Sequence, residues 1–250
     1  MNYRVNLFHI RKFLVIYLVL SLGWVKAQSN TPEATIHKAY NQDKTSEDQI
    51  HLHTVNQKLD SIFKVKDNTF NRYWLSYGLY NQALIADWHE KKEDAEVLID
   101  RAINLLKPLK GDAESQALLS LQLGYSTRFK SYWAMASLGR DALFHAERAV
   151  ELNPNNLRTN LALAINDFYT PKFFGGGKKV EYHLKEALAA PVTSSKDSLP
   201  TWGKSNVYKI IVKHYRKIEK DSIAQDYLNQ GLQEFTESEM LQVLYKNPKK

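Results

Sequence analysis

Residues 142–156 read ALFHAERAVELNPNN, and this stretch decides the fold. The alanines at 142, 146 and 149 recur at helical spacing, so they lie on one face of a helix. Small residues on such a face let a second, antiparallel helix approach closely. Pro154 ends the helix, because proline has no backbone N–H and its ring clashes with the preceding turn. The stretch therefore predicts one helix of a close pair, followed by a tight turn into the next pair.

Similar helix pairs lie on both sides of this stretch. Their features, in chain order, are Trp74, Tyr77 and Gly78 with Ala95, Ile99 and Ala102; Leu123 and Gly124 before the deciding stretch; Leu161 to Phe168 with Val180, Leu184 and Ala187; and Tyr208, Ile211 and Tyr215 with Ala224, Leu228 and Gly231. Together they resemble the tetratricopeptide repeat family, in which each repeat of about 34 residues is a pair of antiparallel helices. The resemblance covers roughly residues 70 to 235.

The predicted fold is therefore all-α: a solenoid of antiparallel helix pairs with about four repeats and a closing helix over residues 238–245. No alternating apolar run between hairpin turns is present, so no strand is expected. A generic all-helical bundle is the alternative. We expect the repeat domain to span residues 47–250, beginning with an amphipathic helix over residues 47–65. Residues 28–46 are polar and are expected to be a flexible leader with at most one short helix.

The first 27 residues have the features of an export signal. Basic residues (Arg4, Arg11 and Lys12) precede an apolar run over residues 13–20, and Ala27 is a small residue at a suitable cleavage position. The apolar run is shorter than the roughly 20 residues that cross a bilayer. We expect cleavage after Ala27, export to the periplasm or the cell exterior, and no stable membrane insertion afterwards. A retained N-terminal anchor is the alternative.

The net charge of +7 belongs largely to this signal. Residues 1–27 hold four of the 34 basic residues and none of the 27 acidic ones, so the remainder has 30 basic and 27 acidic residues, a net charge of +3. Such a balance does not predict a nucleic-acid partner. The chain has no cysteine, which excludes disulfides and lipidation at a cysteine.

No residue set has catalytic or metal-binding spacing. The eight histidines are scattered, and the closest two, His51 and His53, would point to different faces of a helix. A Gly-x-Ser-x-Gly motif is absent as well. We therefore expect a protein that is not an enzyme and that needs no cofactor.

The resemblance instead implies a binding scaffold, in which the stacked first helices of the repeats form a concave face for a protein or peptide partner. The residues expected on that face are Tyr73, Tyr80, Arg158, Leu161, Ile165 and Phe168. Their mixed, mostly apolar chemistry suits aromatic anchoring. The predicted function is non-catalytic recognition in the cell envelope, and the alternative is a small-molecule-binding component associated with a solute transporter.

The loop over residues 170–179 is the most unusual segment, with three glycines at 175–177 beside Phe173, Phe174 and Lys178. We expect an extended loop in which the two phenylalanines pack on the solenoid. The alternative is a set of backbone N–H groups and lysines that binds an anion. The loop also resembles, over a short stretch, Pro-x-x-Phe-Gly-Gly loops of bacterial tetratricopeptide proteins linked to solute transport.

Overall fold

The computed structural model describes residues 31–46, 48, 50–191 and 199–247. The predicted export signal lies outside these residues. Within them the chain forms eleven α-helices and two short 3-10 helices, and no strand. The elements are α2 (Pro32–Asp43), α3 (Ile50–Val65), α4 (Thr69–Trp88), α5 (Lys92–Leu106), α6 (Ala113–Ser126), η1 (Thr127–Phe129), α7 (Tyr132–Leu152), α8 (Leu157–Tyr169), η2 (Lys172–Phe174), α9 (Val180–Ala189), α10 (Lys204–Lys217), α11 (Asp221–Glu234) and α12 (Glu239–Lys246).

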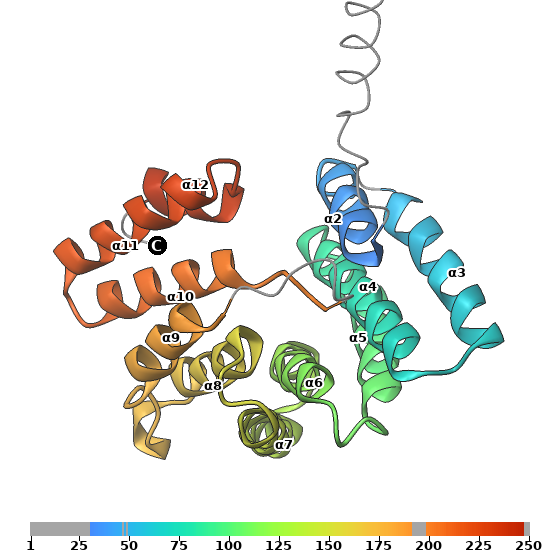
Figure 1. Cartoon of the computed structure of the whole chain (residues 1–250), viewed down its shortest axis with the longest axis horizontal. Coiled ribbons are helices and arrows are strands. Elements are labelled where there is room, and N and C mark those ends of the chain that lie inside the picture. Colours follow the sequence, from blue (N-terminus) through green and yellow to red (C-terminus); the bar gives the residue numbers. More distant parts are fainter. Residues whose placement is uncertain (1–30, 47, 49, 192–198, 248–250) are drawn as a thin grey trace, which may run out of the picture.

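The helices pack as successive pairs, α4 with α5, α6 with α7, α8 with α9 and α10 with α11, which confirms the predicted all-α solenoid. A further pair, α2 and α3, precedes them, and α12 packs on α10 and α11 as the closing helix. The pairs follow one another around an arc that brings α2 and α12 to the two sides of its opening (Figure 1). There Lys44, next to α2, forms an ion pair with Glu239 of α12. Among the described residues, no helix has both the length and the apolar character to span a membrane.

The stretch that decides the fold forms the end of α7 and the turn into α8. Ala142, Ala146 and Ala149 are all 0 % exposed, which agrees with their predicted place between two helices. The turn is held by Asn156, whose side chain accepts hydrogen bonds from two backbone N–H groups in the first turn of α8. The backbone oxygen of Pro154 accepts from the side chain of Asn160 at 2.7 Å. Local sequence therefore fixes both the close contact and the chain reversal.

The segment expected to be a flexible leader needs correction, because most of it is α2 and packs on the domain. Thr31 caps this helix and Pro32 occupies its first turn. Ile36 and Ala39 are buried against the core. Asp43 is also buried, and its carboxylate accepts from two backbone N–H groups at the start of α3, at 3.1 and 2.7 Å. Two buried apolar residues give little periodic signal, so the sequence allowed one short helix here but did not indicate that it packs on the domain.

Candidate functional site

The inner face of the arc is formed by the first helix of each pair: α2, α4, α6, α8 and α10. Consecutive helices are antiparallel, so these first helices all run in the same direction. Their N-terminal halves therefore lie at one end of the inner face and their C-terminal halves at the other. The two ends differ in what covers them.

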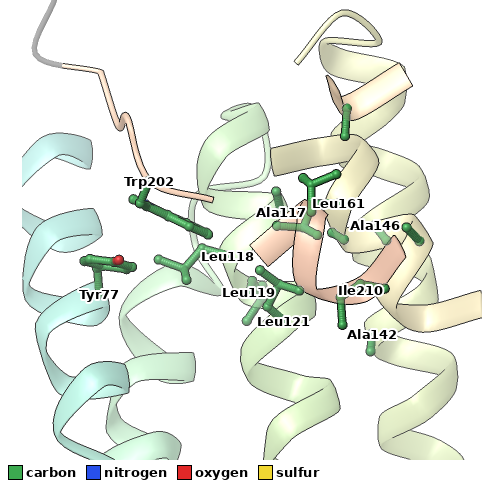
Figure 2. Close-up of a cluster of buried hydrophobic side chains, with 14 of the residues drawn as sticks. Tyr77, Ala117, Leu118, Leu119, Leu121, Ala142, Ala146, Leu161, Trp202 and Ile210 are labelled. Carbon is green, nitrogen blue, oxygen red and sulfur yellow. The ribbon is translucent and has the colours of Figure 1, made fainter. Parts of the chain in front are cut away.

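The N-terminal end is crossed by residues 199–203, the segment that leads into α10, which we call the strap. Its anchor is Trp202, which is only 8 % exposed. The indole ring stacks on Tyr77, with ring centroids 5.1 Å apart and planes at 18°. The indole Nε1 donates a hydrogen bond to the hydroxyl of Tyr73 at 3.0 Å. Figure 2 shows Trp202 reaching from the strap toward Tyr77 of α4.

The strap also binds α2 through Thr201. The backbone N–H and the hydroxyl of Thr201 each donate to one oxygen of the Glu33 carboxylate, both at 2.7 Å. Gly203, two residues further on, has φ of +114°, and a Cβ built there would lie 2.8 Å from Leu157. Glycine is therefore required where the strap turns into α10.

Arg158, at the start of α8, connects the strap to α6. Its guanidinium donates to both oxygens of Glu114, at 2.6 and 2.8 Å, and to the backbone oxygen of Trp202 at 2.8 Å. Burial opposes the charge on Arg158, but the hydrogen bonds and charge of Glu114 outweigh it, so that the pKa of Arg158 is raised. This bidentate, buried ion pair fixes the geometry of the N-terminal end.

Three residues expected to contact a partner lie under the strap or in the core. Tyr73 and Arg158 contact Trp202 directly, and Leu161 is 0 % exposed. The chain itself covers them. The prediction that they are available to a partner is wrong for the structure as it stands.

The C-terminal end carries four tyrosines, Tyr40, Tyr80, Tyr125 and Tyr169, one from each of α2, α4, α6 and α8. Tyr80 and Tyr125 meet edge to face, with ring centroids 5.6 Å apart, and Tyr125 meets Phe129 in the same way at 5.5 Å. Tyr169 is 64 % exposed, and the other three tyrosines are half-buried. We call these four residues the tyrosine cluster. They present aromatic surface that other helices do not fully cover.

The tyrosine cluster is electrostatically coupled. Burial raises the pKa of Tyr80, and the nearby phenols of Tyr40 and Tyr169 raise it further. Burial also raises the pKa of Tyr125, together with the hydrogen bond that this phenol donates to the Asp87 carboxylate at 3.0 Å. These phenols therefore remain neutral at ordinary pH and keep their hydrogen-bonding protons.

Two more predicted residues lie beside the tyrosine cluster on α8. Phe168 is 8 % exposed and stacks edge to face with Tyr169 at 4.9 Å. The ammonium of Lys217, from α10, lies 4.6 Å from the centre of the Phe168 ring and donates to its backbone oxygen at 3.1 Å. Ile165, one turn earlier, is half-buried against the core. Of the six predicted inner-face residues, Tyr80, Ile165 and Phe168 thus belong to the C-terminal end.

The glycine loop differs from the expectation. Phe173 and Phe174 are 92 % and 74 % exposed and do not pack on the solenoid. The side chain of Asp167 accepts from the backbone N–H of Gly177 and of Lys179, at 2.9 and 2.6 Å. Because an acidic side chain already uses these N–H groups, the loop is a poor anion site. Lys178 is exposed and lies beside it.

Sequence reasoning did not identify Tyr40, Tyr125, Tyr169 or the strap. A signal for the tyrosines was present: the four occur at intervals of 40, 45 and 44 residues, about one per helix pair. No comparable signal marks Trp202, because its partners are far away along the chain. In the part of the chain that the structure describes, no group of three or more His, Asp or Glu residues could hold a metal ion.

No protein-family model matches the sequence, and no curated protein matches it. Solved structures do share its fold. TTC0263, a thermophilic TPR protein of Thermus thermophilus, has a TM-score of 0.57 at 15 % identity, over 84 % of this chain and 97 % of that one. The HusA haemophore of Porphyromonas gingivalis has a TM-score of 0.52 at 20 % identity, over 77 % of this chain and 96 % of that one. The chain therefore has the fold of tetratricopeptide repeat proteins.

Proposed function

We propose that this chain is a non-catalytic binding scaffold whose inner face holds a protein or peptide partner at the tyrosine cluster. The observation that carries the proposal is the convergence of four tyrosines from four different helices. A solenoid of helix pairs provides an extended inner surface that suits such recognition.

Tyrosine is well suited to this role because it supplies a large, rigid contact area and a polar tip. It loses little side-chain entropy on binding, and tyrosines are enriched among the residues that dominate interface energies. At the cluster the phenol hydroxyls would hydrogen-bond to a partner while the rings pack on its apolar side chains. Lys217 adds one positive charge beside Phe168, which would favour a partner with an acidic group nearby.

We further propose that the chain works in the cell envelope, either in the periplasm or at the cell exterior. The support is the pattern of residues 1–27, with its basic start, apolar run and Ala27. Fusing residues 1–27 to a reporter enzyme that is active only after export would test this. A reporter that stays inactive would contradict it.

The binding proposal is tested with displayed peptides. Residues 28–250 are immobilised and a random peptide library is selected against them. Selected peptides are then measured against a Tyr80→Ala/Tyr169→Ala variant and a matched control, Tyr132→Ala/Tyr182→Ala, whose two tyrosines are exposed at 75 % and 60 % outside the cluster. We expect affinity to fall at least tenfold for the cluster variant and to be unchanged for the control. Equal binding by both variants would refute the site.

A planar apolar molecule is the second candidate ligand, in line with the alternative of a small-molecule-binding protein linked to solute transport. Two observations favour it: one structure with this fold is described as a haemophore, and the tyrosine cluster presents aromatic rings on which a planar molecule can stack. Titration with haemin, followed by the change in its visible absorbance, would test it with the same two variants. Saturable binding lost only in the cluster variant would favour this ligand over a peptide.

A further inference from the structure

The contacts of the strap are those of a bound peptide. Thr201 and Trp202 lie outside the helices, just before α10, and side chains from three helices far away in the sequence bind their hydroxyl, indole, backbone N–H and backbone oxygen. The groups that bind them are Glu33 of α2, Tyr73 and Tyr77 of α4, and Arg158 of α8. Each group recognises a different feature, so the combination is specific for a hydroxyl residue followed by tryptophan.

Two of these four binding groups, Tyr77 and Arg158, are also held by partners outside the strap. The hydroxyl of Tyr77 shares a hydrogen bond with His37 of α2 at 2.8 Å. Arg158 is held by both oxygens of Glu114. This part of the site is therefore preorganised for the segment that it binds, whichever chain supplies that segment.

The charges of the site also match the backbone groups of the strap. The Glu33 carboxylate accepts from a backbone N–H and a hydroxyl, and the Arg158 guanidinium donates to the backbone oxygen of the next residue. The Arg158 guanidinium also lies 5.8 Å from the centre of the Trp202 ring, where a cation is attracted by the face of the indole. The site thus supplies an acceptor for Thr201, and a donor and aromatic surface for Trp202.

We infer that Glu33, Tyr73, Tyr77 and Arg158 form a second recognition site, for a non-helical segment in which threonine or serine precedes tryptophan. In this chain Thr201 and Trp202 fill the site in cis. A partner that carries the same dipeptide in a non-helical segment competes with the strap for it. This inference goes beyond the tyrosine cluster, because it concerns the opposite end of the inner face.

A tethered occupant has a high effective concentration, of the order of millimolar for a short linker. A free peptide of modest affinity therefore binds poorly until the strap is weakened. The test uses a fluorescently labelled peptide with the sequence of residues 199–204, Leu-Pro-Thr-Trp-Gly-Lys, acetylated and amidated. Its binding to residues 28–250 and to a Trp202→Ala variant is measured by anisotropy.

We expect saturable binding to Trp202→Ala and at least tenfold weaker binding to the unchanged chain. Peptides in which Thr is changed to Val or Trp to Ala should not bind the Trp202→Ala variant. The unchanged peptide should not bind a protein that carries both Trp202→Ala and Glu33→Gln. A folded Trp202→Ala chain that does not bind the peptide, or equal binding by variant and unchanged chain, would overturn the inference.

A second variant keeps the test decisive if Trp202→Ala unfolds. Thr201→Val retains the indole but removes one hydrogen bond to Glu33, so the strap is weakened without leaving a large cavity. It should bind the peptide more tightly than the unchanged chain, and no gain would overturn the inference. Adding Tyr80→Ala/Tyr169→Ala to either variant should leave binding of this peptide unchanged. The result for the strap site therefore does not depend on whether the tyrosine cluster is a binding site.

Discussion

The two ends of the inner face are built on the same helices, but they differ in whether their side chains are already bound by other parts of the chain. At the N-terminal end, Glu33, Tyr73 and Arg158 are bound to the strap or to Glu114 and are buried. At the C-terminal end, the tyrosine cluster keeps aromatic surface uncovered. Side-chain chemistry alone would have marked the charged end as the site. Groups that are already bound within the chain stabilise the fold, whereas groups that remain uncovered can bind a ligand.

The substitution with the largest expected effect is Arg158→Ala, which tests whether the N-terminal end is structural. The change leaves the Glu114 carboxylate largely buried, at 11 % side-chain exposure, without its charge partner. We expect the free energy of unfolding to fall by about 3–5 kcal/mol, measured by urea denaturation. The control is Arg148→Ala, which removes an exposed ion pair with Glu151 and should cost less than about 1 kcal/mol. Equal losses would show that the N-terminal end is not held by this ion pair.

Trp202→Ala should have the next largest effect, because it removes the anchor of the strap from Tyr73 and Tyr77. We expect a loss of about 3 kcal/mol, seen as a lower urea midpoint. Trp133→Ala removes an indole that is 84 % exposed and should change stability by less than about 0.5 kcal/mol. A small effect of Trp202→Ala would mean that the strap contributes little to the stability of the N-terminal end.

Acidification should weaken the N-terminal end through His37, which shares a hydrogen bond with Tyr77. Burial lowers the pKa of His37, against the opposing charge of Glu33, so the folded chain resists a proton that the unfolded chain accepts. This contribution to stability is complete above about pH 6.5 and is lost as the pH falls below it.

Urea denaturation at pH 7.5, 6.5 and 5.5 would measure this dependence. His37→Gln should reduce the slope of the unfolding free energy against pH, by less than about 1.4 kcal/mol per pH unit. A part of the dependence should remain, because burial also lowers the pKa values of His145, His183 and His214. An unchanged dependence in His37→Gln would contradict the assignment.

Tyr169→Ala should have the smallest effect on stability and a clear effect on binding. The side chain is 64 % exposed, so we expect a change in unfolding free energy within about 0.5 kcal/mol. Ligand affinity at the tyrosine cluster should fall about tenfold, measured by titration with a selected peptide or with haemin. A large loss of stability would mean that the C-terminal end is structural as well.

The sequence by itself determined the fold, because helix pairs are local. Ala142, Ala146 and Ala149 with Pro154 specify one close pair and its turn, and similar patterns recur along the chain. The same reasoning allowed at most one short helix in residues 28–46 and did not predict that α2 packs on the domain, because only Ile36 and Ala39 are buried apolar residues there. Local periodicity predicts a helix only where enough of its residues are apolar.

The resemblance to a repeat family led to the expectation of Tyr80, Ile165 and Phe168 on the inner face, and in the structure these residues lie at or beside the tyrosine cluster. Only the tertiary structure showed that Trp202 covers Tyr73 and Arg158, since a contact between residues 129 positions apart leaves no periodic trace in the sequence. Residues close together in the chain determine where a helix forms and which residues share one of its faces. Whether that face is open to a partner depends on which distant segment folds over it.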